Sequence, residues 1–487
     1  MAEKFSPWLA HAAEVYPGKT ALQFRQYTWT YAQLYKATGH FAQSMGIERD
    51  SRIAIISVNC PEQIIASHGI MLVGGTVAHI NHRLSPAEIA EQVKQISPDL
   101  VLFQENLNEK IPETVNAFSL DAVDLFMRTP LSLRDKGISP DATCAIFMTS
   151  GTTGTPKAVQ LSYRNFIASA ISSALNIGIN PEDRWLACLP LDHIGGFSIL
   201  TRSAIYGTAV ELHSGFDPDW IKQSLAHNGT SLMSLVPTML QKLLDIGVQP
   251  TESLRAILLG GGRIQKDLVQ KAWDSGLPVL PSYGLTEACS QVTTLPPEEV
   301  NERPDSAGKP LPMTEIKIIS EDGEESSAGK IGEIHVKSPK VMNGYLNDPE
   351  ATRQSIKNNW LTTGDSGHVD ADGFLYPVSR RSDLIVSGGE NIYPVEVESA
   401  LSKHPDIKDV CVFGIDDEKL GQKVAAAIVL KAGLQLKSIQ LTQNEFPELA
   451  SYKFPKEIVQ VKAIPKTSLG KPKRRILQKR FSAKLSE

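Results

Sequence analysis

Apolar runs with strong β propensity alternate with amphipathic stretches over residues 20–215. RIAIISV (52–58) and LVLFQ (100–104) predict buried strands, and SPAEIAEQVKQI (85–96) has the apolar spacing of a helix. This alternation predicts an α/β fold with layers around a largely parallel sheet. Because the pattern continues through LRAILLGGG (254–262), we expect one large amino-terminal domain of layered sheets and helices.

The pattern changes after Tyr283, where shorter strands are separated by turn residues. Three such runs are TEIKIIS (314–320), GEIHVKS (332–338) and GFLYPVS (373–379), which predict a β-rich subdomain. The rest of the chain predicts a compact α+β unit with the size of an independent domain. A helix is expected after Tyr393, because Pro394 suits a first helical position. We therefore predict a large domain at 1–381 and a small carboxy-terminal domain at 382–487.

Length and composition narrow the class of protein. The 487 residues exceed the roughly 250–300 that one hydrophobic core can hold, so at least two packed units are expected. Lys and Arg number 49 and Asp and Glu 54, and the net charge of −5 provides no global field for nucleic acid. The five cysteines lie far apart without a CxxC pair, which argues against a disulfide framework or a zinc ribbon. No apolar run approaches the ~20 residues that cross a bilayer, so we expect a cytoplasmic protein that has no membrane span and keeps its first residues.

The strongest local motif is TSGTTGTPKAV at residues 149–159, directly after the apolar run CAIFM. Backbone N–H groups and hydroxyls of such a loop can surround phosphate oxygens while a lysine supplies a cation. An ordinary Gly/Thr turn is the alternative. The motif is not a Walker loop because no GK[ST] closes it, and AEVYPGKT (13–20), which resembles one, follows helical periodicity. The candidate phosphate-binding residues are Thr149, Ser150, Gly151, Thr152, Thr153, Gly154 and Lys157.

Three further motifs carry polar groups that suit a nucleotide. In SYGLTEACS (282–290), an aromatic ring, a glycine, a hydroxyl and a carboxylate could serve a base, a phosphate and Mg²⁺. A strand end with a helix cap would produce the same pattern. Residues 361–398 place Asp365 and Arg380 among turn glycines, where they could hold a ribose diol. The basic segment IPKTSLGKPKRRIL (464–477) contains a lysine that taken singly is more typical of a solvated helix face.

The joint order of these four motifs resembles the adenylate-forming superfamily of acyl-CoA synthetases, luciferases and peptide-synthetase adenylation domains. The similarity runs from TWTYAQL near residue 28 to the GK at residues 470–471. It implies a mobile carboxy-terminal domain with a hinge at residues 382–383. It also implies an enzyme with two half-reactions. A carboxylate attacks the α-phosphate of MgATP to give acyl-AMP and pyrophosphate, and a thiol, usually coenzyme A, then displaces AMP.

The resemblance implies a role for each residue that matches a superfamily motif. The phosphate loop would hold the β- and γ-phosphates, with Thr286 near the α-phosphate and Glu287 on Mg²⁺. Lys471 would swing in to stabilise the adenylation transition state, as a charge delivered by a moving domain can. Asp365 would bind the ribose hydroxyls, with Arg380 beside them. The adenine pocket would be lined by Gly260, Gly261, Gly262, Tyr283 and Gly284.

Within the superfamily, four segments are most similar to the 2-succinylbenzoate:CoA ligases of menaquinone biosynthesis. They are residues 189–207, 234–244, 283–298 and 386–398. A substrate with a second carboxylate needs a cation or several donors beyond the reacting centre. Arg202 is the candidate cation, and a surface or interdomain arginine is the alternative interpretation. Ser290 and Thr293 are candidate donors, and His193 resembles the position that lines and gates the acyl pocket.

Other functions are left open at this point. Another aryl- or acyl-CoA ligase, acting on a benzoate, a cinnamate or a medium-chain acid, would share these motifs, as would a luciferase. A catalytically inactive nucleotide-binding regulatory protein is a remote alternative. The chain departs from the superfamily pattern at Ser379, where glycine is common, and at Pro472, where an aliphatic residue is usual, so the hinge geometry is open. A homo-oligomer and an acetylation of Lys471, which would remove its charge, are also left open.

Overall fold

The computed structural model describes residues 5–123, 137–150, 156–262, 265–320, 322–379, 384–431, 434–436, 441–465, 472 and 474–484. The chain divides into two compact units. The first comprises Met1–His82, Val93–Met148 and Ala158–Ser379, and the second comprises Arg83–Gln92, Thr149–Lys157 and Arg380–Glu487. The predicted boundary and hinge at residues 381–383 lie outside the described residues and stay predictions.

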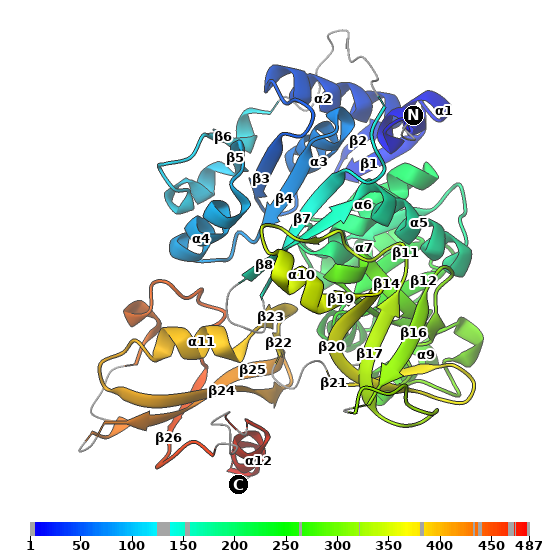
Figure 1. The fold of residues 1–487 in the computed structure, drawn as a ribbon. Coiled ribbons are helices and arrows are strands. Elements are labelled where there is room, and N and C mark those ends of the chain that lie inside the picture. Colours follow the sequence, from blue (N-terminus) through cyan, green and yellow to red (C-terminus); the bar gives the residue numbers. More distant parts are fainter. Residues whose placement is uncertain are drawn as a thin grey trace. The chain divides into compact units, whose positions relative to one another are not determined.

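The largest sheet among the described residues has nine strands and belongs to the first unit (Figure 1). In spatial order its strands are β15 (Lys309–Pro310), β14 (Ser290–Thr294), β13 (Val279–Leu285), β12 (Ala256–Leu259), β11 (Leu232–Leu235), β9 (Arg184–Ala187), β10 (Ala209–Leu212), β1 (Thr20–Phe24) and β2 (Tyr27–Thr30). The strands from β9 to β13 run parallel. The helices that connect them are α6 (Ile194–Tyr206), α7 (Pro218–His227), α8 (Pro237–Asp245) and α9 (Lys266–Asp274). This is the strand and helix alternation that the sequence predicts.

A seven-stranded sheet forms the second layer of the first unit. Its order is β18 (Gly344–Tyr345), β8 (Pro156–Ser162), β7 (Thr143–Ser150), β4 (Thr76–Ile80), β3 (Arg52–Ile56), β5 (Leu100–Phe103) and β6 (Ala117–Ser119). The two predicted strands at residues 52–58 and 100–104 are therefore confirmed, and they pair in parallel. The described helices before β9 are α1 (Trp8–Val15), α2 (Tyr31–Ser44), α3 (Pro61–Val73), α4 (Pro86–Ile96), which is divided between the two units, and α5 (Tyr163–Ile177). One apolar core joins the two sheets, with Leu22, Ile55 and Phe197 among its buried members.

The β-rich subdomain predicted after Tyr283 is an antiparallel five-stranded sheet. Its strands are β16 (Glu315–Ile319), β17 (Gly332–Lys337), β19 (Ile356–Lys357), β20 (Trp360–Val369) and β21 (Leu375–Ser379), and α10 (Pro349–Ser355) precedes β19. The three runs that predict this subdomain become β16, β17 and β21. The α/β fold class with a β-rich subdomain is confirmed.

The second unit contains a five-stranded sheet with a helix on each face, coloured orange to red in Figure 1. Its elements are β22 (Ile385–Ser387), β23 (Glu390–Ile392), α11 (Pro394–Leu401), β24 (Ile407–Asp417), β25 (Gly421–Leu430), β26 (Glu457–Gln460) and α12 (Arg474–Lys484). Alternate residues of a strand point to opposite faces. Val412 of β24 therefore packs in the core that α11 covers, whereas Phe413 packs against Phe481 of α12. The helix predicted after Tyr393 is α11, with Pro394 in its first turn.

Local sequence explains where several helices begin and end. Thr30 and Gln33 form a capping box at the start of α2, so two otherwise unpaired backbone N–H groups are satisfied. Ser162 and Asn165 do the same for α5, which leads out of the predicted phosphate loop region. Helix α3 ends at Gly74, whose φ of 87° lies in the left-handed region that glycine adopts without strain. Short polar signals therefore position the helices on either side of the parallel strands.

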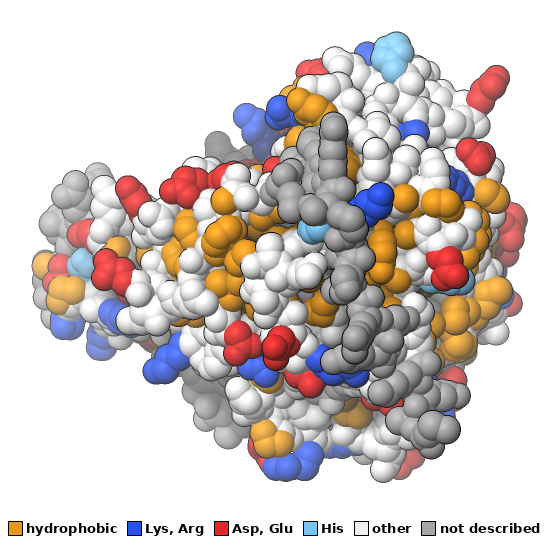
Figure 2. Space-filling model, turned by 90° about the horizontal axis from the view of Figure 1, so that it is seen from above, with side chains coloured by type: hydrophobic (Ala, Val, Ile, Leu, Met, Phe, Trp, Pro, Cys, Tyr) orange, Lys and Arg blue, Asp and Glu red, His pale blue; other side chains and the backbone are white. Residues whose placement is uncertain are grey.

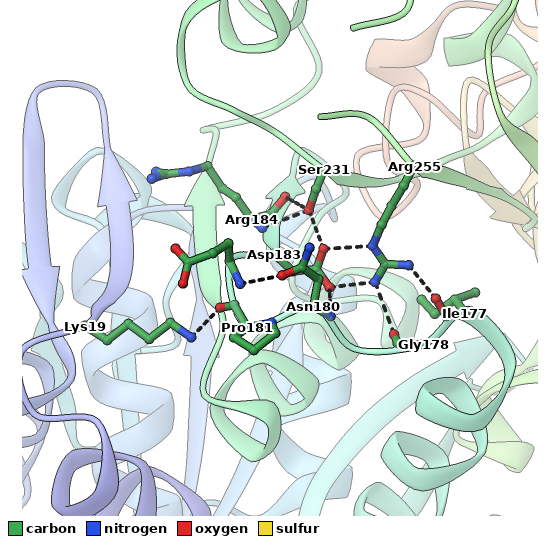
Figure 3. A network of polar contacts seen from close by, with 10 residues as sticks. Lys19, Ile177, Gly178, Asn180, Pro181, Asp183, Arg184, Ser231 and Arg255 are labelled. Carbon is green, nitrogen blue, oxygen red and sulfur yellow. Dashed lines mark hydrogen bonds and ion pairs between the residues drawn. The ribbon is translucent and has the colours of Figure 1, made fainter. Parts of the chain in front are cut away.

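A polar network ties the turn after α5 to the nine-stranded sheet (Figure 3). The carboxylate of Asp183 accepts hydrogen bonds from Arg255 Nε at 2.8 Å and Nη2 at 2.6 Å, and from Ser231 Oγ at 2.8 Å. The backbone N–H of Asn180 donates to the same carboxylate at 2.9 Å. Burial by itself would raise the pKa of Asp183, but these hydrogen bonds and the charge of Arg255 lower it below the usual range.

Replacing Asp183 by Asn is expected to reduce the free energy of unfolding at pH 7 by about 2 kcal/mol, because hydrogen bonds to charged groups contribute ~1.5–3 kcal/mol. The lowered pKa means that the stabilisation is complete above the unfolded-state pKa of about 3.9 and is lost as pH falls through the folded-state value. Denaturant titrations of both proteins across this range measure the difference. The exposed Asp274, changed to Asn, is the control. Equal stability of wild type and Asp183→Asn at pH 7 would contradict the prediction.

The described surface carries charged side chains of both signs, in agreement with the nearly balanced numbers of acidic and basic residues. Acidic and basic side chains lie interspersed on the face shown in Figure 2. In the described part of the chain, no helix is both long enough and apolar enough to span a bilayer.

Candidate active site

The predicted adenine pocket lies where β12 ends in three glycines. The backbone passes close to neighbouring elements here: a Cβ on Gly260 would lie 3.2 Å from the carbonyl oxygen of Ser282, and one on Gly262 would lie 3.1 Å from Cδ of Pro237. Gly261 has a φ of 71°, which L side chains rarely adopt. These three positions expose backbone at the carboxyl end of a parallel strand, which is where open α/β sheets bind ligands.

The aromatic and the carboxylate predicted to hold the nucleoside meet in the structure. Tyr283 of β13 donates a hydrogen bond from its hydroxyl to Oδ2 of Asp365 in β20 at 2.7 Å. Both residues are nearly buried, with 7% and 8% of their surface exposed. The bond joins two motifs that are 82 residues apart. It fixes the ring of Tyr283 beside the predicted ribose carboxylate.

The turn after β13 positions Glu287. A Cβ on Gly284 would lie 2.1 Å from the carbonyl oxygen of Ser290, so only glycine fits where β13 and β14 approach each other. Cys289 and Ser290 both have positive φ values, 50° and 82°, and make the tight turn back into β14. Tyr345 donates from its hydroxyl to Oε1 of Glu287 at 3.2 Å, and the backbone N–H of Met342 donates to the Glu287 carbonyl at 2.9 Å.

This arrangement fits Mg²⁺ bound together with ATP. Mg²⁺ in phosphate sites takes one or two protein carboxylates and completes its shell with phosphate oxygens and water. The described residues contain no group of three or more His, Cys, Asp or Glu side chains that would form an all-protein metal site. Glu287, which accepts the hydrogen bond from Tyr345, is the candidate carboxylate for such a site.

The phosphate loop connects β7 and β8. Thr149, at the end of β7, donates from its hydroxyl to the backbone carbonyl of Lys157 at 3.3 Å. This bond joins the two ends of the loop. The predicted phosphate-binding residues inside the loop lie outside the described residues, and so does the side chain of Ser150. They are Gly151, Thr152, Thr153 and Gly154. The apolar run before the motif lies in β7, and β8 follows the loop.

His193 stands at the amino terminus of α6. It is the N-cap residue and is half-buried, and its carbonyl accepts hydrogen bonds from the backbone N–H groups of Gly196 and Phe197 at 3.1 and 3.0 Å. A Cβ on Gly196 would lie 2.3 Å from the carbonyl oxygen of Pro190, so the first turn of α6 packs directly on the preceding loop. The residue predicted to line the acyl pocket is thereby held at a fixed helix end.

Arg202 lies in the same helix and is 2% exposed, so the interpretation as a surface arginine is wrong. Its Nη2 donates to the hydroxyl of Ser169 at 3.1 Å, and Ser169 in turn donates to the carbonyl of Cys289 at 2.8 Å. Burial lowers the pKa of the guanidinium. Of the two candidate donors, Thr293 already donates its hydroxyl hydrogen to the carbonyl of Ala307 at 2.7 Å, and Ser290 is the first residue of β14.

Lys471, the candidate catalytic lysine, and Arg380, the candidate nucleotide-binding arginine, lie outside the described residues, so their roles stay predictions. The described chain near Lys471 is anchored by Arg474 at the start of α12, which donates from Nη2 to both carboxylate oxygens of Glu398 in α11 at 2.8 and 2.6 Å. No sequence motif indicates Tyr345 or Lys340. Lys340 lies between β17 and β18, and Tyr345 lies in β18. No residue pattern there points to a site, and only the fold brings Tyr345 to Glu287 and Lys340 close to Arg202.

The structure divides into two units, and in the first unit the candidate nucleotide-binding residues Tyr283 and Asp365 lie within hydrogen-bond distance of each other. Residues 9–346 match the AMP-binding enzyme family, and residues 396–471 match the AMP-binding enzyme C-terminal domain. The chain belongs to the AMP-binding enzyme family. Its predicted place in the adenylate-forming superfamily is confirmed.

Individual relatives are similar over nearly the whole chain. The chain is 39% identical over 468 residues to the 2-succinylbenzoate–CoA ligase of Bacillus subtilis (strain 168), which covers 95% of this chain and 96% of that protein. It is similar to a double mutant of o-succinylbenzoate CoA synthetase from Bacillus subtilis bound with the product analogue OSB-NCoA, with a TM-score of 0.92, 37% identity and 98% coverage of both chains. It is also similar to the Bacillus subtilis synthetase in complex with ATP and magnesium ion, with a TM-score of 0.76, 37% identity, and coverage of 97% of this chain and 99% of that one.

Proposed function

We propose that this protein is an AMP-forming acid–thiol ligase that joins 2-succinylbenzoate to coenzyme A, a step of menaquinone biosynthesis. The observation that carries the proposal is the 39% identity, over 95% of this chain, to the 2-succinylbenzoate–CoA ligase of Bacillus subtilis. The bond between Tyr283 and Asp365 and the placement of Glu287 support a site for ATP.

In the first half-reaction, an oxygen of the substrate carboxylate bonds to the α-phosphorus of ATP, and the bond to pyrophosphate breaks. Because carboxylate and phosphates repel each other, cations must offset the charge that develops at the α-phosphorus. Lys157 and the loop before it serve the β- and γ-phosphates, and Lys471 serves the transition state. Thr286 lies beside the α-phosphate. Glu287 holds Mg²⁺, which neutralises phosphate charge when it is bound.

In the second half-reaction, the thiol sulfur of coenzyme A bonds to the acyl carbon, the bond to the phosphate oxygen of AMP breaks, and AMP leaves. Lys471 withdraws after the first step, so that the thiol can approach. Asp365 and Tyr283 hold the nucleoside through both steps, with Arg380 beside the ribose. His193, at the start of α6, lines the acyl pocket.

The test is a competition among acids. The purified protein is incubated with MgATP, coenzyme A and a panel that contains 2-succinylbenzoate, benzoate, cinnamate and a medium-chain acid, and the thioesters are identified by mass spectrometry. We expect 2-succinylbenzoyl-CoA to form far faster than any other product. If another thioester dominates, the protein is a different acyl-CoA ligase of the same family. If ATP binds but no pyrophosphate forms with any acid, the protein is an inactive regulatory relative.

Arg202 is assigned to the second carboxylate of the substrate. Replacing Arg202 by Leu is expected to raise the KM for 2-succinylbenzoate about 10- to 100-fold and to leave the KM for ATP unchanged, because charge-assisted hydrogen bonds contribute ~1.5–3 kcal/mol. Steady-state kinetics with both substrates varied measure the two constants. Arg353 of α10, whose side chain is 67% exposed, is the matched control when it is changed to Leu. An unchanged KM for 2-succinylbenzoate would remove Arg202 from the substrate site.

The cytoplasmic location and a homo-oligomeric state remain part of the proposal. The same is true of the domain division at 1–381 and 382–487. Size-exclusion chromatography with light scattering tests the oligomeric state.

A further inference from the structure

A second buried cation, Lys340, lies beside Arg202. Lys340 follows β17 on the segment that leads to β18, and its side chain is fully buried, at 0% exposed. Its Nζ donates to the carbonyl oxygen of Gln291 in β14 at 2.9 Å. Arg202 approaches the same turn through Ser169, which donates to the carbonyl of Cys289. The positive charge of Arg202 acts directly on Lys340.

Neither cation has an acidic partner among the residues that the structure describes. No salt bridge among the described residues involves Arg202 or Lys340, and Nε of Arg202 is buried without a hydrogen-bond partner. The other titratable groups that face the pair are the thiol of Cys289 and the hydroxyl of Tyr206. Both are neutral near pH 7, since burial raises the pKa of Cys289 to about 12 and that of Tyr206 above its usual value.

Two buried charges of the same sign are costly unless an anion joins them. A buried ammonium or guanidinium group without a counterion loses its hydration, and hydrogen bonds to neutral groups replace only part of it. A carboxylate has two oxygens and can accept from both cations at once. The two cations therefore suit the binding of a carboxylate that belongs to a ligand.

We propose that Arg202 and Lys340 together form a buried binding site for the second carboxylate of the acyl substrate, with Lys340 as a specificity-determining residue. This inference rests on the proposed function, because it takes the acid to be a dicarboxylate. It adds a residue that neither the superfamily motifs nor the sequence pattern indicate.

The geometry of α6 supports this placement. His193 caps the helix, and Arg202 follows nine residues later, which is about 13 Å along the axis at 1.5 Å per residue. The guanidinium of Arg202 lies over the ring of Trp185 in β9 and donates to Ser169 of α5. The two residues that the proposed function assigns to the acyl substrate therefore belong to one helix.

The protonation of Lys340 supplies a signature for the site. Burial and the charge of Arg202 lower the pKa of Lys340 to about 7. A bound carboxylate has the opposite effect and raises that pKa, so binding above pH 7 takes up a proton. The affinity for the dicarboxylate then falls as pH rises above 7, by up to about tenfold per pH unit until the pKa of the complex is reached.

The experiment compares 2-succinylbenzoate with 4-oxo-4-phenylbutanoate, the same keto acid without the second carboxylate. In the wild type, we expect the ratio of KM for 2-succinylbenzoate to KM for the monocarboxylate to rise between pH 7 and 9. Effects of pH on ATP, coenzyme A or the reacting carboxylate cancel in this ratio. In Lys340→Met, we expect the KM for 2-succinylbenzoate to rise about 10- to 100-fold, the KM for the monocarboxylate to stay within about twofold, and the pH dependence of the ratio to disappear.

Lys337 in β17 is the control lysine, because it is partly exposed and pairs with Glu315 at 3.0 Å. Lys337→Met should leave both KM values and their pH profiles unchanged. A purely structural Lys340 would change both acids equally in Lys340→Met, and this outcome would overturn the inference. If that variant does not fold, a wild-type ratio that is flat between pH 7 and 9 would overturn it as well.

The two proposals fail in different ways. If the wild type forms no 2-succinylbenzoyl-CoA, the proposed function is wrong. If the wild type forms it selectively and Lys340→Met keeps the same selectivity between the two acids, the function stands and the assignment of Lys340 is wrong.

Discussion

Replacing Lys471 by Ala is expected to slow acyl-adenylate formation by about 10²- to 10³-fold or more, the loss typical when a group that stabilises developing negative charge is removed. The α-phosphorus gains a fifth oxygen ligand while three phosphates and a carboxylate crowd together, so we expect the lysine charge to act mainly in the transition state. The binding of ATP should therefore change little. The rate of pyrophosphate release in single-turnover experiments measures the chemical step.

The second half-reaction separates this role from a general loss of structure. Lys471→Ala should convert preformed acyl-adenylate and coenzyme A to thioester at a rate within a few-fold of the wild type, because the transfer to a thiol does not need a cation at the α-phosphorus. Lys462, an exposed lysine shortly before it in the chain, is the control when it is changed to Ala. Equal losses in both half-reactions would contradict a role confined to adenylation.

Replacing Glu287 by Gln is expected to lower kcat/KM for MgATP about 100-fold or more, because a metal ion at a phosphoryl group supplies several kcal/mol of charge stabilisation. The amide keeps the size of the side chain and can still accept from Tyr345, so the turn that carries it should remain folded. The apparent affinity for Mg²⁺ should fall with the rate. A titration of Mg²⁺ at fixed ATP, followed by pyrophosphate release, measures both effects.

Tyr345→Phe provides the matched comparison. It removes only the 3.2 Å hydrogen bond to Oε1 of Glu287 and leaves the carboxylate in place. A loss of about tenfold or less is expected, since a typical hydrogen bond contributes ~0.5–1.5 kcal/mol. A Glu287→Gln variant with normal Mg²⁺ dependence would contradict the assignment of this carboxylate to the metal.

The fold class could be predicted because its signals are local. A buried parallel strand is a short apolar run whatever it pairs with, so residues 52–58 and 100–104 identify β3 and β5 without any knowledge of the sheet. Pro394 similarly identifies the start of α11, because its fixed φ and missing N–H suit only the first turn. The order of the strands could not be predicted in this way. In the nine-stranded sheet β10 lies between β9 and β1, and that order depends on pairing across long stretches of chain.

In the candidate site, too, the sequence indicates some residues and not others. The motif residues Tyr283, Glu287 and Asp365 could be selected because each stands in a short pattern that a nucleotide requires. The residues that contact them could not be selected from the sequence. The sequence gives no reason to connect Glu287 with Tyr345, which the return of the chain to β18 places within hydrogen-bond distance.

The sequence by itself determined the alternation of strands and helices, the glycine and hydroxyl composition of the phosphate loop, and the residues that resemble an adenylate-forming site. These properties depend on neighbours along the chain, because hydrophobic periodicity and turn chemistry act over a few residues. Only the tertiary structure decided which side chains are buried together. Arginine is a residue type that usually lies at the surface, and Lys340 belongs to no motif. The packing of α6 against the turn before β14 nevertheless removes both side chains from water. A buried charge is stabilised or penalised by whatever lies within a few ångströms, and that is decided by contacts between distant parts of the chain.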